Sequence, residues 1–141
     1  MSNRTDIKKR VIQTAEAVLY KQQYVSPIDI FVGIEWLQPI HVQDWRKGKI
    51  PYLEKVIQGN LSKVSFAMKC FRKWAIEKNL RPSKTVYLIR TKGLRREAVF
   101  SKSGDFNIEK AYNTNYVSPV LSEKKQQKLK EKLDKPPELD E

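Results

Sequence analysis

The sequence predicts an α+β fold that is mostly helical, with about four helices, a two-stranded antiparallel hairpin placed like a wing, and a disordered C-terminal tail. Apolar residues recur at helical spacing before residue 80, and the period becomes extended between residues 85 and 100. Residues 118–141 contain no aromatic residue and alternate Lys with Glu. With 141 residues the chain suits one domain, expected over residues 1–117, followed by a charged tail over 118–141.

The first helix is expected to start at Thr5 and Asp6, which can cap it, and to end at about Gln22. It lacks the uninterrupted apolar stretch of a signal peptide, and no run in the chain approaches the 18 apolar residues of a membrane span. We therefore expect a cytoplasmic protein without membrane association. The apolar positions that form one face of this helix are Ile7, Val11, Ala15, Val18 and Leu19.

A second, short helix is predicted from Ser26 to about Trp36. Ser26 is a favoured N-cap, Pro27 is tolerated at the first helical position, and Asp29 suits the positive end of the helix dipole. These three residues together define where the helix begins.

A third helix is predicted from Pro39 to about Lys47. Its apolar residues Ile40, Val42 and Trp45 have spacings that can share a buried side, and Gly48 is a natural C-terminal stop. The second and third helices should therefore meet at an angle near residues 37–38.

A long helix is predicted over residues 51–79, because its apolar residues keep a strict four-three alternation. A seam this regular requires a partner helix, and the first helix is the simplest one. A homodimer through residues 51–79 is the competing use of the same seam. The residues of this seam are Ile57, Leu61, Val64, Met68, Phe71 and Ala75.

A hairpin is predicted over residues 85–100, because two segments rich in β-branched and aromatic residues flank Lys92 and Gly93. A two-residue turn at these positions pairs Arg90 with Arg95 and Ile89 with Arg96. A short closing helix over residues 105–112 follows the hairpin.

The predicted pairing crowds like charges at the hairpin tip, which destabilises a hairpin unless an anionic partner relieves the repulsion. The alternative explanation is that charge on an edge strand protects the protein against aggregation. The crowded residues are Arg90, Lys92, Arg95 and Arg96.

Positive charge is concentrated in the middle of the chain. Residues 46–102 carry 16 Lys or Arg against 3 acidic residues, a net charge of +13, whereas the whole chain carries +12. Such a block attracts a polyanion, so nucleic acid is the first partner to consider. The alternative is that the charge serves solubility alone.

Enzymatic chemistry finds little support in the sequence. Cys70 is the only cysteine and His41 the only histidine, so neither a disulfide nor a zinc cluster is expected. Acidic residues are sparse where the positive charge is strongest, which disfavours a metal-dependent nuclease. Asp29, Glu35 and Asp44 could converge across the two short helices, but helix caps and solvated faces explain them more simply. We expect a non-catalytic protein without metal or cofactor.

Residues 26–54 resemble repressor-type helix-turn-helix proteins, most clearly in residues 37–49 and the following 51–54. In that family a valine and a tryptophan three positions apart are buried, and a glycine ends the helix before a basic turn and a proline. Val42, Trp45, Gly48 and Pro51 occupy these places. The chain also resembles small uncharacterised bacterial proteins, which implies a bacterial origin and no particular function. The resemblance implies that Gln38, His41 and Gln43 point towards bases, Val42 and Trp45 inward, and Arg46, Lys47 and Lys49 towards phosphates.

These observations favour a nucleic-acid-binding protein, with duplex DNA preferred over RNA. A short helix over residues 39–47 and a basic hairpin are the two elements that a winged binder uses, one for base edges and one for phosphates. The alternative is an interaction module or small subunit that docks on an acidic protein or on structured RNA. The residues expected to contact nucleic acid are Gln38, His41, Gln43, Arg46, Lys47, Lys49, Arg90, Lys92, Arg95, Arg96 and Lys102.

Overall fold

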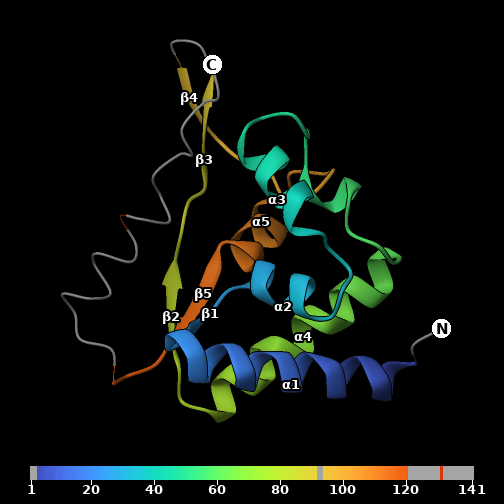
Figure 1. Cartoon of the computed structure of the whole chain (residues 1–141), viewed down its shortest axis with the longest axis vertical. Helices are drawn as coiled ribbons and strands as arrows, with labels where there is room; N and C mark the ends of the chain where they lie inside the picture. The colour runs from blue at the N-terminus through green and yellow to red at the C-terminus, as the bar shows by residue number, and fades with distance from the viewer. Residues whose placement is uncertain (1–2, 92–93, 121–130, 132–141) are drawn as a thin grey trace.

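A computed structural model describes residues 3–91, 94–120 and 131 of the chain (Figure 1). Its α+β architecture confirms the predicted fold class. In chain order the described elements are α1 (Arg4–Gln22), β1 (Tyr24–Val25), α2 (Pro27–Gly33), α3 (Pro39–Arg46), the 3-10 turn η1 (Leu53–Lys55), α4 (Leu61–Glu77), β2 (Arg81–Lys84), β3 (Leu88–Thr91), β4 (Leu94–Glu97), α5 (Phe106–Tyr112) and β5 (Thr114–Val117).

Helices α1 and α4 lie side by side and form the base of the molecule (Figure 1). The predicted pairing of the first and long helices is therefore confirmed. Ile7, Val11 and Ala15 of α1 are buried, as are Val64 and Phe71 of α4. The cap of α1 is Asn3, not Thr5 or Asp6, and the Asn3 side chain accepts a hydrogen bond from the Asp6 backbone N–H at 2.9 Å.

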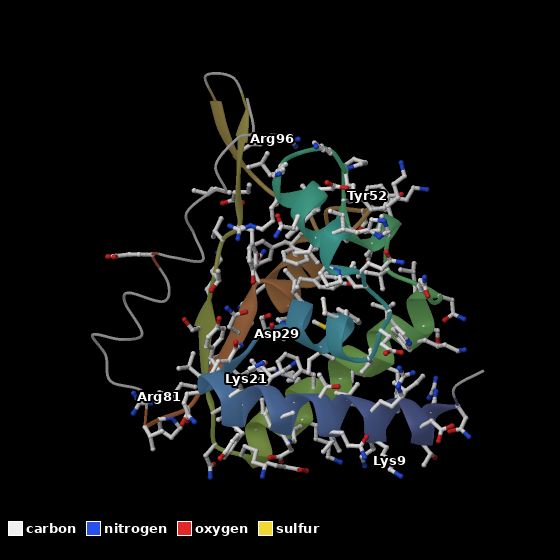
Figure 2. All side chains as sticks on the ribbon, viewed as in Figure 1. Lys9, Lys21, Asp29, Tyr52, Arg81 and Arg96 are labelled. Carbon is white, nitrogen blue, oxygen red and sulfur yellow. The ribbon has the colours of Figure 1, made fainter. Side chains whose placement is uncertain are left out.

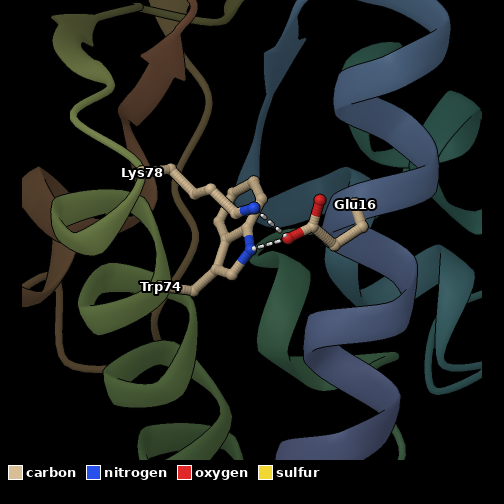
Figure 3. Close-up of polar contacts among 3 residues, drawn as sticks. All are labelled: Glu16, Trp74 and Lys78. Atoms are coloured by element: carbon tan, nitrogen blue, oxygen red, sulfur yellow. Dashed lines mark hydrogen bonds and ion pairs between the residues drawn. The ribbon is translucent and has the colours of Figure 1, made fainter.

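A polar cluster ties the same two helices together (Figure 3). The indole N–H of Trp74 donates to Glu16 Oε1 at 2.9 Å, and Lys78 Nζ lies 2.8 Å from the same oxygen. Hydrogen bonds from Lys78 and then Trp74 lower the pKa of Glu16 below its ordinary value. Glu16 and Lys78 are each 45% exposed, so the ion pair contributes little, and the indole hydrogen bond mainly fixes the orientation of Trp74.

The prediction of one unbroken helix over residues 51–79 is wrong. The chain first makes η1 and then a turn, in which Gly59 has a φ of +116° that side chains rarely adopt. Asn60 then caps α4, because its side chain accepts from the Lys63 N–H at 2.9 Å. Leu61, expected in the buried stripe, is the first helical residue and is 68% exposed. Gly59 and the N-cap Asn60 therefore determine where α4 begins, although the apolar alternation continues on their N-terminal side.

Helix α2 begins as predicted, with a reciprocal capping box. The Asp29 N–H donates to Ser26 Oγ at 3.1 Å, and the Ser26 N–H donates to Asp29 Oδ2 at 3.0 Å. The helix ends at Gly33, earlier than the predicted Trp36. Gly33 permits close packing on α1, because a Cβ added there would lie 2.1 Å from the Thr14 methyl carbon.

A small three-stranded antiparallel sheet in the order β1-β5-β2 is absent from the sequence prediction. In it, Tyr24 lies opposite Val117, and Pro82 lies opposite Tyr116. The sequence analysis assigned no strand to residues 24–25, 81–84 or 114–117, which form this sheet. The buried Asn115 supports the sheet by donating from Nδ2 to Thr85 Oγ1 at 3.0 Å.

The hairpin forms with the predicted register. Ile89 lies opposite Arg96, and Arg90 lies opposite Arg95. Its strands, Leu88–Thr91 and Leu94–Glu97, are shorter than the predicted segments. The turn residues 92–93 lie outside the described residues, as do residues 121–130 and 132–141 of the predicted tail.

Among the described residues, no helix combines the length and apolar character needed to cross a membrane. One cluster of buried side chains joins α1, α2, α3, α4, α5 and the residues that flank the hairpin. The hairpin therefore projects from a continuous core, with α3 lying towards the same end of the long axis (Figure 1).

Candidate nucleic-acid interface

Trp45 anchors α3 to the base of the hairpin. Its side chain is completely buried, and its indole N–H donates to the Val99 carbonyl oxygen at 2.7 Å. Its ring lies 4.8 Å from the ring of Phe100 and 5.6 Å from that of Tyr87, measured between centroids. Tyr87 directly precedes β3, whereas Val99 and Phe100 follow β4. These contacts make α3 and the hairpin base one packed unit.

The exposed side of α3 is formed by Ile40 and Gln43. Ile40 is 59% exposed and Gln43 is also exposed, and residues three apart share one side of a helix. Ile40 was expected to be buried, and its exposure is a correction. Gln38, at the N-cap position, is exposed and its side chain makes no capping hydrogen bond. The helix thus presents two glutamines and an apolar side chain to solvent.

The side chain of His41 does not point fully to solvent, as base contact would require. It is half-buried, and its Nδ1 is buried without a hydrogen-bond partner. It precedes Trp45 by four positions, so it lies on the buried side of α3. Val42 packs against the core as expected. His41 is consequently less suited to base contact than Gln43.

The turn after α3 positions two lysines. The Gly48 N–H donates to the Trp45 carbonyl at 3.1 Å, and the Lys49 N–H donates to the Asp44 carbonyl at 2.9 Å. With a φ of 81° at Gly48, this is the Schellman pattern, and it confirms Gly48 as the helix stop. Lys49 is exposed and Lys47 is half-buried directly beyond the helix.

Arg46 has a structural contact that the sequence did not indicate. Its guanidinium carbon lies 5.3 Å from the centroid of the Tyr87 ring, and Arg46 is half-buried. Burial, followed by the Asp29 carboxylate, raises the pKa of Tyr87, so its phenol stays neutral at ordinary pH. This cation–π contact joins the end of α3 to the segment before β3. Arg46 therefore serves the α3–hairpin junction as well as any phosphate contact.

The hairpin contributes arginine positions to the candidate surface. Arg90 and Arg95 are direct cross-strand partners, and Arg96 is exposed. Figure 2 shows Arg96 towards one end of the molecule, whereas Lys9, Lys21 and Arg81 lie towards the other. Lys92 belongs to the predicted set but lies outside the described residues.

Lys102 lies apart from the α3 surface. It is exposed and lines a groove between α4 and α5, together with Glu54 and Tyr112. Its backbone N–H donates to Glu54 Oε1 at 3.1 Å. Gln43 therefore lies on α3, Gln38 at its start and Lys47 and Lys49 at its end, whereas Lys102 lines the α4–α5 groove.

The sequence prediction missed Ile40 as a candidate contact residue. An apolar side chain on a groove-facing helix can contact the methyl group of thymine, and Ile40 shares its exposed side with Gln43. The exposure of Ile40 could have been predicted from its spacing to the buried Trp45, because residues five positions apart point about 140° away from each other on a helix.

The described residues offer no group of three or more His, Cys, Asp or Glu side chains able to hold a metal ion. Asp29 is engaged at the start of α2, where its carboxylate also accepts a hydrogen bond from Gln22 Nε2 at 3.0 Å. Cys70 is half-buried, and burial raises the pKa of its thiol, which suits a packing role. Any functional assignment rests on this geometry, because the chain matches no protein family model and no curated protein or solved structure proved significantly similar to it.

Proposed function

We propose that this protein is a non-catalytic nucleic-acid-binding protein that prefers duplex DNA and acts in the cytoplasm. The observation that supports this proposal most strongly is the anchoring of α3 on the hairpin base through Trp45 and Val99. It joins a helix with exposed Gln43 to a hairpin whose cross-strand partners are Arg90 and Arg95. In this arrangement α3 contacts base edges while the hairpin and the turn at Lys49 contact phosphates.

The side chains exposed on α3 favour DNA over RNA. Gln43 carries an amide that can pair with the N6 and N7 atoms of adenine, and Ile40 can contact the thymine methyl group, which RNA lacks. The adenine N6 and N7 atoms and the thymine methyl group are all accessible in the wide major groove of B-DNA. The major groove of duplex RNA is too narrow for side chains.

The first test is the salt dependence of duplex binding. About five phosphate contacts should lower the affinity several-hundred-fold between about 50 and 200 mM salt, because bound cations are released on contact. Fluorescence anisotropy with labelled duplex DNA, single-stranded DNA and structured RNA, each at two salt concentrations, measures this effect and the preference together. An affinity for duplex DNA that stays level over this range contradicts the proposal, and a stronger affinity for RNA contradicts the preference.

A second test addresses sequence readout by α3. Gln43→Ala should reduce the preference for a site selected from random duplexes by about 1–3 kcal/mol and leave non-specific binding unchanged. Gln13→Ala is the matched control, since Gln13 is an exposed glutamine on α1. Competition between the selected site and random duplex measures both variants. If Gln43→Ala behaves like Gln13→Ala, α3 does not read bases.

A further inference from the structure

An apolar groove runs between α4 and α5, separate from the exposed side of α3. It consists of two adjoining hollows of about 710 and 700 Å³ that share Ser65, Met68, Asn107 and Ala111. Along α4 the lining extends from Leu61 to Ile76, a distance of about 23 Å at 1.5 Å per residue. This length corresponds to a helix of about 15 residues.

The groove keeps large apolar side chains in contact with solvent. Leu61 is 68% exposed and Ile76 60% exposed on α4, and Ile108 is 42% exposed on α5. A groove between two helices that exposes apolar side chains can accommodate the apolar side of a third helix.

The rim of the groove is positively charged. Lys69, Arg72 and Lys110 line one hollow and Lys102 lines the other. Glu54 is the carboxylate that lines the groove, and its oxygens already accept from Tyr112 Oη at 2.9 Å and from the Lys102 N–H. The groove therefore favours an occupant with acidic residues beside its apolar stripe.

The same charge argument distinguishes among possible occupants. Residues 121–135 of this chain carry six Lys against three acidic residues, so the rim repels them, and the acidic end at residues 138–141 is too short to fill a groove of about 23 Å. A second copy docked groove to groove would place two lysine- and arginine-lined rims together. Neither occupant matches the rim as well as an acidic helix does.

We propose that the α4–α5 groove binds an acidic amphipathic helix of a partner protein, with apolar side chains of that helix seated between Leu61, Met68 and Ile108. The helix lies along α4, and its acidic flanks face Lys69, Arg72 and Lys110. Because Gln43 and Arg96 do not line the groove, the protein can hold this partner independently of the nucleic-acid contact proposed above.

A synthetic amphipathic peptide of about 18 residues tests this proposal, with Leu at helical spacing and Glu on the remaining positions. Isothermal titration calorimetry with the full chain should show one-to-one binding. The matched peptide with every Glu replaced by Lys should bind at least about tenfold more weakly, as electrostatic complementarity requires. Equal affinity for both peptides, or no binding of the acidic peptide, overturns the proposal. Analytical ultracentrifugation of the free chain tests a second copy as the occupant. If the chain forms dimers and the Leu61→Ser variant does not, the groove binds a second copy and the proposal is overturned.

Substitutions in the groove lining test whether the acidic peptide binds there. Leu61→Ser combined with Ile108→Ser should weaken acidic-peptide binding about tenfold or more, since both side chains are exposed and removable without harm to the core. Tyr20→Ser on α1, 88% exposed and outside the groove lining, is the matched control. Duplex DNA binding should be unchanged in all of these variants, so that failure of the groove proposal and failure of the DNA proposal give different results. Equal effects of the double variant and of Tyr20→Ser contradict the assignment.

Discussion

Trp45→Ala should lower the free energy of unfolding by about 3–5 kcal/mol, because it removes a completely buried aromatic side chain from the junction of α3 and the hairpin base. It also leaves the Val99 carbonyl, which accepts the indole hydrogen bond at 2.7 Å, without this partner. Phe100 and Tyr87, which pack on the Trp45 ring, lose a contact surface at the same time. Urea denaturation followed by circular dichroism measures the effect, and the melting temperature should fall by at least about 10 °C.

Trp45→Phe separates the packing and hydrogen-bond contributions. It keeps an aromatic ring between Phe100 and Tyr87 but cannot donate to Val99, so a smaller loss of about 1–3 kcal/mol is expected. DNA affinity of the alanine variant should be measured well below its melting temperature. Unchanged stability of Trp45→Ala would show that α3 is not anchored in this way, and the proposed interface would lose its main support.

Features set by a few neighbouring residues could be predicted from the sequence. The capping box at Ser26 and Asp29 involves positions three apart, and Gly48 supplies the positive φ that ends α3. The hairpin register follows from a two-residue turn, so the pairing of Arg90 with Arg95 required no knowledge of the remaining fold.

Features that depend on distant segments could not be predicted. Strand β1 is two residues long, and its partner Val117 is more than ninety positions away from Tyr24. Strand β2 contains Arg81 and Pro82, and both are exposed, so neither an apolar alternation nor β-branched residues mark it. Such strands form because the rest of the fold brings them together.

The orientation of α3 was predicted only in part. The burial of Trp45 was expected, but its partners Val99 and Phe100 come from a segment more than fifty positions later in the chain. Once these contacts fix the side of α3 that faces inward, His41 becomes half-buried and Ile40 exposed. Tertiary packing, which a local pattern does not contain, decides which side chains can reach a ligand.

The hairpin arginines carry the second large expected effect. Replacing Arg90, Arg95 and Arg96 with Ser should leave the domain folded, since Arg96 is exposed and the change removes like charges from the directly paired positions 90 and 95. Duplex affinity should fall about 100-fold at about 0.1 M salt, and the salt slope should decrease by about 2.7, if each arginine neutralises one phosphate. The loss should be the same for selected and random sequences, because phosphate contacts carry no base information.

A control of equal charge decides whether the contact is local. Lys9, Lys21 and Arg81 are exposed and lie towards the opposite end of the molecule from Arg96 (Figure 2), so replacing these three with Ser removes the same net charge away from the candidate interface. This variant should lose only a few-fold in affinity, because charges more than a Debye length of about 10 Å from the bound duplex are largely screened at about 0.1 M salt. If both triple variants weaken binding equally, the attraction comes from the overall charge and the hairpin is not a contact surface. If the hairpin variant unfolds in circular dichroism, its arginines stabilise the fold and the proposed phosphate contacts must be abandoned.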